Sequence, residues 1–383
     1  MAMGLRYGMN PHQRARVSAG GDHVRVVHGA ASMINYLDAL NAWQLVAEAS
    51  RATGKVAAAS FKHVSPAGAA LAGNLDETMC HSWGLGDSSV GPITAAYVRA
   101  RDADPRSSYG DMIAVSEPVD HELAELLASV VSDGIIAPGY APGTVAALGR
   151  KKGGRFVVFE IDPAFQPPRS EVRTVFGVSF EQDRDHLPIT EDLLEVTVGD
   201  PISGNATIDA LLGMVTARYT QSNTVVYVRD GMSIGVGAGQ QSRIDCTLLA
   251  GSKARTWWTR RHPAVQQMPL PSTMSRQQRL NWQISTAAGT LTPAQSRELV
   301  SGRTRSDSFL EEAERASWAH QLSGVSLVSD GYLPFRDNID VAAEHGVELC
   351  IEPGGALQSN VIADACREHR ITLARTGVRL FHH

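Results

Sequence analysis

The chain has 383 residues, of which 43% are hydrophobic and 20% charged, and its formal net charge is −5. This composition is typical of a globular protein with two or three domains. No block of like charge indicates a nucleic-acid surface, no apolar run approaches the ~20 residues of a membrane span, and the N-terminus lacks the apolar segment of a signal peptide. We therefore expect a soluble, cytoplasmic protein.

The first half alternates helical and extended patterns. Tyr36, Leu40, Trp43 and Ala47 recur at helical spacing and predict a helix over 35–50. The pattern then predicts, in order, a strand at 56–61, a strand at 112–115, a helix around 120–130 and a strand at 134–137. Alternation of this kind is typical of an α/β layered domain.

A similar order recurs in the second half. It predicts a helix at 208–215, a strand at 224–228, an Asp230-Gly231 hairpin turn, a strand at 233–236, a helix from about 242, a strand at 325–328, a helix near 338–345 and a strand at 348–351. The two halves look like weakly related copies. We expect one unit over 1–165 and a second over 166–383, irregular at 165–203 and with a helical insertion at about 262–320.

Cysteine and histidine usage gives no sign of a metal site. Cys80, Cys246, Cys350 and Cys366 are dispersed, and none forms a C-x-x-C pair. The 13 histidines include no H-E-x-x-H motif. We expect reduced, mostly buried cysteines and neither a structural nor a catalytic zinc ion.

The adjacent pair Lys62-His63 is the strongest candidate for chemistry. It follows the apolar run 56–61 and precedes Ser-Pro-Ala-Gly at 65–68. Consecutive strand residues point to opposite faces, so both side chains reach one substrate only if the strand ends here, and the Pro and Gly indicate that it does. A neutral His can accept a proton while the Lys stabilises negative charge. The alternative is a surface Lys beside a loop His.

Three further segments are candidates for binding. In 5–13, Arg6 and Tyr7 suit an anionic group, and the alternative is a disordered start. The glycine-rich segment 235–243 differs from G-x-G-x-x-G and predicts a close approach of the backbone to a ligand or another strand, or a plain tight turn. Segment 329–338 gathers two aromatics, a Pro and carboxylates, and its alternative is a helix N-cap at Asp337 or Asn338.

Taken together, nine stretches resemble the transformylase half of the bifunctional purine enzyme in which AICAR transformylase is joined to IMP cyclohydrolase. In chain order they are LRYGMNPHQ (5–13), DALNAWQL (38–45), AAASFKHVSPAGAA (57–70), SSYGDMIAVS (107–116), SDGIIAPGY (132–140), YTQSNTVVY (219–227), IGVGAGQQSRI (234–244), PFRDNID (334–340) and GVRLFHH (377–383).

The resemblance implies a fold and an assembly. The fold is α/β, with two cytidine-deaminase-like αβα units from an internal duplication, the helical insertion, and no zinc. The assembly is a homodimer with active sites at the interface, and a structural monovalent cation is compatible with it. Neither nucleic acid nor membrane is an implied partner. The resemblance covers none of the cyclohydrolase half, so we expect no cyclohydrolase activity and a separate IMP cyclohydrolase downstream.

The implied reaction moves a formyl group from the cosubstrate 10-formyltetrahydrofolate to the 5-amino group of AICAR. By resemblance, His63 is the base, Lys62 the assisting cation and Asn223 the group near the formyl oxygen. The matching nucleotide contacts are Arg6, Tyr7, Asn41, Gly110, Asp133 and Arg379. The matching folate contacts are Arg243, Ile244, Pro334, Phe335 and Asp337. The C-terminal His383 also belongs to the family's site region.

The chain departs from the family pattern at the pocket walls. Tyr332-Leu333 replaces Phe-Phe, Tyr109 replaces Phe, and Asp245-Cys246-Thr247-Leu248 replaces His-Cys-Thr-Arg. These changes bear on substrate affinity more than on reaction type. The competing hypothesis is a non-catalytic folate- or nucleotide-binding relative. A deaminase is excluded because no H-x-E…C-x-x-C ligand set exists.

Overall fold

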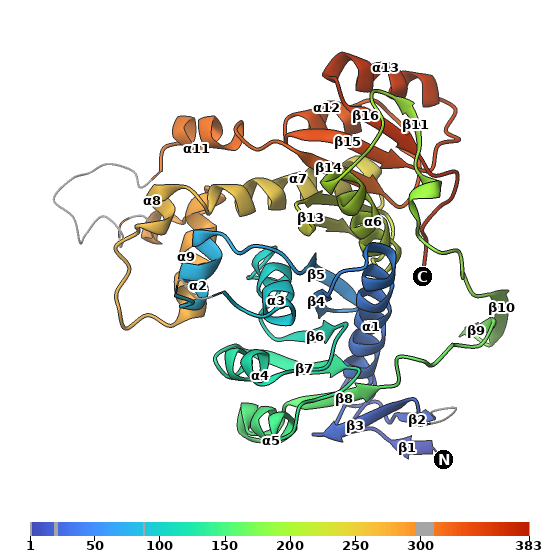
Figure 1. The fold of residues 1–383 in the computed structure, drawn as a ribbon, viewed down its shortest axis with the longest axis vertical. Helices are drawn as coiled ribbons and strands as arrows, with labels where there is room; N and C mark the ends of the chain where they lie inside the picture. Colours follow the sequence, from blue (N-terminus) through green and yellow to red (C-terminus); the bar gives the residue numbers. More distant parts are fainter. Residues whose placement is uncertain (1, 19–21, 87–88, 296, 298–309, 383) are drawn as a thin grey trace.

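A mixed sheet of 12 strands runs through the protein, with helices on both faces (Figure 1). The computed structural model describes residues 2–18, 22–86, 89–295, 297 and 310–382. The α/β class predicted from the sequence is confirmed. His383 and part of the expected helical insertion lie outside the described residues.

The order of strands in the sheet is β11-β16-β15-β14-β12-β13-β5-β4-β6-β7-β8-β3. The first half contributes β3 (Val24–His28), β4 (Ala57–Lys62), β5 (Ser65–Leu71), β6 (Asp111–Val115), β7 (Ser132–Ala137) and β8 (Val157–Ile161). The second half contributes β11 (Glu195–Val198), β12 (Thr224–Arg229), β13 (Met232–Ala238), β14 (Val325–Ser329), β15 (Val347–Glu352) and β16 (Thr372–Arg375). Two separate hairpins pair β1 (Ala2–Gly4) with β2 (Arg16–Ser18) and β9 (Ser170–Val175) with β10 (Val178–Asp183).

The two halves of the large sheet repeat one pairing pattern. In the first, β4 pairs antiparallel with β5 and β6, then β6, β7 and β8 run parallel, and β3 closes the edge antiparallel. In the second, β12, β13, β14, β15, β16 and β11 follow the same scheme. The halves meet where Ala70 of β5 bridges Met232 of β13. This repetition supports two related halves, whereas the cytidine-deaminase likeness and the boundary at 165/166 stay predictions.

Helices cover both faces of the sheet, and each face has its own core. On one face lie α1 (Met33–Thr53) and α6 (Asn205–Arg218), which also contact each other. The other face carries α3 (Pro92–Asp102), α4 (His121–Ala128), α5 (Thr144–Gly149), α7 (Arg243–Thr259), α12 (Asp337–Ala343) and α13 (Ser359–His369). Helix α1 begins at a capping box on Ser32 and ends at Gly54 in the left-handed conformation, so both ends are set by local sequence.

The sequence-based elements are largely confirmed, but the expectation for 165–203 was wrong. The helix predicted at 35–50 is α1, and the strand predicted at 112–115 is β6. The segment 165–203 is not irregular, because it contains the β9–β10 hairpin and β11. A hairpin turn at Phe176-Gly177, with φ of 47° and 80°, lacks the usual Asn-Gly or Asp-Gly signal, which explains why it was missed.

The glycines of 235–243 serve helix packing. A Cβ on Gly235 or Gly237 would collide with a backbone carbonyl oxygen of α7, that of Ala250 or Cys246 respectively. The expected close approach therefore exists, but its partner is a helix rather than a ligand or a strand. Gly239 takes a φ of +68° in the turn that leads into α7.

The helical insertion projects from the end of α7. Its described helices are α8 (Pro263–Gln266) and α9 (Arg276–Ala287), which contribute to a small separate core, and α11 (Glu312–Ala319), which contacts α7. A buried ion-pair network fixes the start of the insertion to the sheet domain. Asp102 at the end of α3 forms ion pairs with Arg260 and Arg261, each at 2.8 Å. The remaining described helix, α2 (Glu77–Trp83), packs against α3. The four cysteines are free, and only Cys80 is not buried.

Candidate functional site

Lys62 and His63 lie where β4 reverses into β5. Lys62 is the last residue of β4, and His63 and Val64 form a two-residue turn with φ of 54° and 60°. The break is this turn, so the expected break at 65–68 was wrong and those residues belong to β5. Pro66 is tolerated there because it pairs with Phe61 next to a β-bulge, where the ladder is already irregular.

The turn points Lys62 toward the loop before β6. The Lys62 Nζ donates to the backbone carbonyl oxygen of Tyr109 at 2.5 Å. His63 is solvent-exposed. Left-handed backbone at two consecutive residues, one of them β-branched, is uncommon, and such outliers are frequent at functional sites. The geometry therefore places two titratable side chains at one accessible point.

Asp38 of α1 anchors this turn, and sequence reasoning missed it. The Val64 N–H donates to Asp38 Oδ1 at 2.6 Å, and the carboxylate is only 8% exposed. Burial raises the pKa of Asp38, although the Val64 amide and the charges of His63 and Lys62 act in the opposite direction. A usable signal was present, because Leu-Asp-Ala-Leu at 37–40 recurs as Ile-Asp-Ala-Leu at 208–211.

Three other candidates of the first half, Asn41, Gly110 and Asp133, lie near Asp38 or act on its surroundings. Asn41 lies one turn later on α1, where its side chain donates to the Leu37 carbonyl at 2.9 Å. Gly110 follows Tyr109 with a φ of +78°, and a Cβ there would lie 3.7 Å from Asp133 Oδ1. The Asp133 carboxylate acts electrostatically on Asp38 and forms an ion pair with Lys152 at 2.6 Å. We call Asn41, Lys62, His63, Gly110 and Asp133 the first cluster.

A buried polar network holds the loop at 107–110 against β4. The Ser60 hydroxyl donates to Asp111 at 2.7 Å and lies 2.8 Å from the Ser108 hydroxyl, from which it can accept. Asp111 also pairs with Arg101 at 2.6 Å. Burial raises the pKa of Asp111, although the positive charge of Arg101 acts to lower it. Because these buried groups bond to one another, the network fixes the position of the backbone carbonyl that accepts a hydrogen bond from Lys62.

Asn223, Arg243 and Asp330 lie around the start of α7, and we call them the second cluster. The Asn223 Nδ2 donates to the carbonyl oxygens of Gln240 and Gln241, each at 2.9 Å, and the Asn223 Oδ1 accepts from Arg243 at 2.8 Å. The buried Arg243 also pairs with Asp330, whose carboxylate accepts from the Thr224 N–H at 3.0 Å. The side-chain amide of Asn223 is therefore fully engaged within the chain.

The remaining folate-side candidates surround the start of α12. Ile244 and Pro334 are half-buried, and Phe335 and Asp337 are exposed. Asp337 is the first residue of α12, and the N-cap position is Arg336 without a side-chain cap, so the alternative of an N-cap at Asp337 or Asn338 was wrong. The Asp337 carboxylate accepts from its neighbour Asn338 at 2.8 Å.

The two chain ends carry the remaining candidates. Arg6 donates to the Tyr7 hydroxyl at 3.1 Å, and its guanidinium lies 4.8 Å from the Tyr7 ring centroid. At the other end, the Arg379 guanidinium lies 5.2 Å from the Phe381 ring centroid. The Leu380 N–H donates to the Asp330 carbonyl at 2.9 Å, which places Arg379 with the second cluster.

Between described residues, no hydrogen bond or ion pair joins a member of the first cluster to Asn223 or Arg243. The described residues also contain no group of three or more His, Cys, Asp or Glu side chains that could hold a metal ion. None of the described helices is both long and apolar enough to cross a membrane.

Comparisons with known proteins identify relatives over the whole length. A family model described as the AICARFT/IMPCHase bienzyme matches residues 1–253. The bifunctional purine biosynthesis protein PurH of Aquifex aeolicus (strain VF5) is 29% identical over 387 residues, covering 99% of this chain and 59% of the relative. The PurH protein of Roseobacter denitrificans is 29% identical over 394 residues, covering 100% and 60%. The chain thus spans about 60% of the length of these curated relatives.

Proposed function

Because this chain belongs to the AICARFT/IMPCHase bienzyme family, we propose that it acts in purine biosynthesis as a formyltransferase. The reaction moves the formyl group of 10-formyltetrahydrofolate to the 5-amino group of AICAR. The observation that carries the proposal is the turn after β4, where Lys62 and His63 lie together beside Asp38, Gly110 and Asp133.

The chemistry needs a base and a cation. The amine of AICAR is a weak nucleophile, because its lone pair is delocalised into the ring and carboxamide. As its nitrogen attacks the formyl carbon, His63 takes the amine proton and Lys62 stabilises the oxyanion of the tetrahedral intermediate. The bond to N10 of the folate then breaks, and the leaving nitrogen receives a proton. The bond from Lys62 to the Tyr109 carbonyl orients the ammonium for this task.

Substrate binding is divided between the two clusters. Arg6 and Arg379 form no ion pair with a described carboxylate, which leaves both guanidinium groups available for the nucleotide phosphate. Exposed Phe335 and Asp337 suit an aromatic ring with hydrogen-bond donors, as in a pterin. Arg243 acts through Asn223 and Asp330 rather than on the ligand, because both partners hold its guanidinium.

We further propose that the chain forms a homodimer. In the β9–β10 hairpin, Val175, Val178 and Phe180 share one face through their pairing register and are 49%, 56% and 58% exposed. Phe176 at the tip is fully exposed. The same face also carries Arg173, opposite Phe180, and apolar side chains exposed together in this way indicate a protein contact. We propose that this hairpin binds a second copy and that each active site combines the first cluster of one chain with the second cluster of its partner.

A second candidate is a non-catalytic folate- or nucleotide-binding relative. The hydrogen bonds of Asn223 within the chain favour this alternative. The side-chain amide can donate to a formyl oxygen only if it first gives up one of these hydrogen bonds. Two of the positions that depart from the family, Tyr109 and Tyr332, have exposed side chains and so could alter ligand affinity without touching Lys62 or His63.

The assay that separates these candidates uses the purified chain with AICAR and 10-formyltetrahydrofolate. We expect release of tetrahydrofolate and formation of formyl-AICAR without IMP, since the nine matching stretches all belong to the transformylase half. Product should rise only to a modest equilibrium level, and adding a separate IMP cyclohydrolase should increase conversion by removing it. Binding of both ligands without turnover would favour the non-catalytic relative, and IMP from this chain alone would reveal a second active site.

Asp38→Asn tests the anchor of the catalytic turn. We expect kcat to fall about 10–100-fold with little change in KM, since a small misplacement of reacting groups is enough for such a loss. The matched control is Asp209→Asn. Asp209 accepts hydrogen bonds from Asp230 and Gly231 in the equivalent hairpin of the second half. Equal losses in both variants would mean that destabilisation, not positioning, explains the effect.

A further inference from the structure

The second half contains a structural counterpart of the catalytic turn. Asp230 and Gly231 reverse β12 into β13 with φ of 52° and 70°, as His63 and Val64 reverse β4 into β5. Asp209 of α6 accepts from both turn amides, at 2.9 and 2.5 Å, in the role that Asp38 has in the first half. The repeat therefore contains two anchored turns, and only one of them is used by the proposed reaction.

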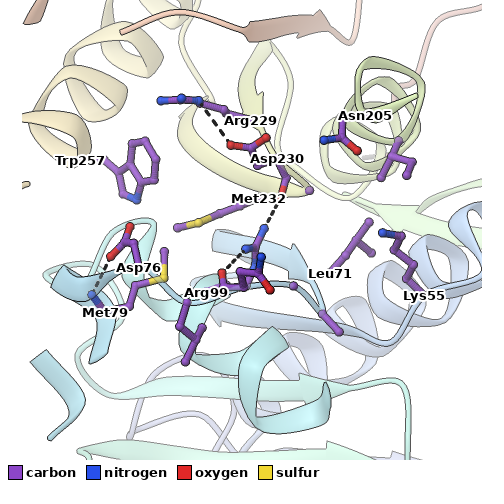
Figure 2. Close-up of a pocket in the computed structure, with 16 residues that line it drawn as sticks. Lys55, Leu71, Asp76, Met79, Arg99, Asn205, Arg229, Asp230, Met232 and Trp257 are labelled. Carbon is purple, nitrogen blue, oxygen red and sulfur yellow. Dashed lines mark hydrogen bonds and ion pairs between the residues drawn. The ribbon is translucent and has the colours of Figure 1, made fainter. Parts of the chain in front are cut away.

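A cavity of about 590 Å³ opens at this second turn (Figure 2). Its walls come from both halves of the chain, and they include Lys55, Leu71, Arg99, Asp230, Met232 and Trp257. The lining contains none of the catalytic, nucleotide or folate candidates. The cavity is thus distinct from both clusters described above, and its size is in the range of small-molecule sites.

Arg99 is the unusual group in this cavity. Its side chain is 6% exposed, and Figure 2 places its guanidinium between the carbonyls of the two walls. It donates to the carbonyl oxygens of Asn74, at 2.7 Å, and Asp230, and its Nε has no partner. It forms no ion pair with any described carboxylate. Burial lowers the pKa of Arg99, despite the nearby negative charges of Asp230 and Asp209.

The wall carboxylates nearest to this cation already have other cationic partners. Asp76 pairs with Arg261 at 2.7 Å, and Asp230 pairs with Arg229 at 3.5 Å, so both wall carboxylates have other cationic partners. The Lys55 side chain forms no hydrogen bond or ion pair with the rest of the described chain. Asp209 and Asp230 act on Arg99 electrostatically, but no carboxylate of the described residues bonds to its guanidinium. An oxyanion that enters the cavity would supply the missing direct contact to this buried cation.

We propose that this cavity is a second small-molecule site that binds an oxyanion group, a phosphate or a carboxylate, at Arg99. Lys55 adds a second positive charge at the wall. Helix α6 begins at the lining residue Asn205 without a side-chain cap, so its first turn also favours negative charge. Leu71, Met232 and Trp257 offer apolar surface for the rest of the ligand.

Calorimetric titration at constant ionic strength tests this site, with inorganic phosphate and succinate as separate probes. The protein carries Arg6→Ala and Arg379→Ala, so that the proposed nucleotide phosphate contacts do not contribute. We expect one-to-one binding of at least one probe. Binding of phosphate alone indicates a phosphorylated ligand, and binding of succinate alone indicates a carboxylate. The test does not depend on formyl transfer, because it measures binding only.

Variants in the same background locate the binding. Arg99→Gln should weaken it roughly 10–100-fold, the range for a lost charge-assisted hydrogen bond. Lys55→Ala should weaken it about two- to fivefold, as for one exposed ion pair. Arg51→Ala, which removes an exposed charge of α1 outside the cavity, is the matched control. The proposal is overturned if neither probe binds, if Arg51→Ala weakens binding as much as Lys55→Ala, or if folded Arg99→Gln binds as the parent does.

Discussion

Replacement of His63 by alanine is expected to lower the turnover of formyl transfer by roughly 10²–10⁴-fold, the range for a lost general base. The imidazole lies at an exposed turn beside Lys62, where it can reach the amine of a bound nucleotide. Binding of AICAR should persist, since other residues hold its phosphate. The measurement is kcat at saturating AICAR together with the Kd for AICAR in the same variant.

His63→Asn is the matched control for the turn itself. Asparagine tolerates positive φ better than most residues, so this variant keeps the reversal of β4 into β5 and removes only the base. It should be as inactive as His63→Ala. If His63→Asn instead retains parental turnover while His63→Ala does not, His63 acts through backbone geometry and is not the base.

The sequence predicted the position of the second-half turn, but not the shape of the turn at His63-Val64. An Asp-Gly pair is a strong hairpin signal, and it located the second-half turn at 230–231 correctly. His63-Val64 adopts the same backbone without that signal, because β4 and β5 pair along their length and Asp38 holds the Val64 amide. Tertiary contacts of this kind have no local pattern, and a Pro-Ala-Gly segment therefore suggested a break instead of a strand.

The same reasoning explains what was missed at the sheet edges. β3 and β11 each lie at an edge, paired with strands that are far away in sequence, and their short segments carry no periodicity of their own. Asp38 was missed because its function depends on a hairpin packed against α1. By contrast, the long amphipathic helix α1 was found almost to its ends, since helical spacing and its caps are local properties.

The largest effect away from the first cluster is expected from Phe180→Asp. A charge on the apolar face of the β9–β10 hairpin should convert a dimer into a monomer and abolish formyl transfer, because the two clusters would no longer meet. Light scattering after size-exclusion chromatography gives the mass, and the formyl-transfer assay gives the activity. Ser179→Asp places the same charge on the opposite face of the same hairpin and should leave both unchanged. A fully active Phe180→Asp monomer would contradict the composite site.

Mixed dimers test directly whether one active site takes residues from both chains. If each site takes His63 from one chain and Asn223 from the other, a heterodimer of His63→Ala and Asn223→Ala chains has one site with both defects and one intact site. Random mixing makes about half of all dimers heterodimers, so roughly a quarter of the sites recover. If both residues act within one chain, every site in the heterodimer carries one defect and nothing recovers. Recovery near a quarter of parental activity, with heterodimers verified by mass, therefore supports a site built across two chains, and its absence places the whole site in one.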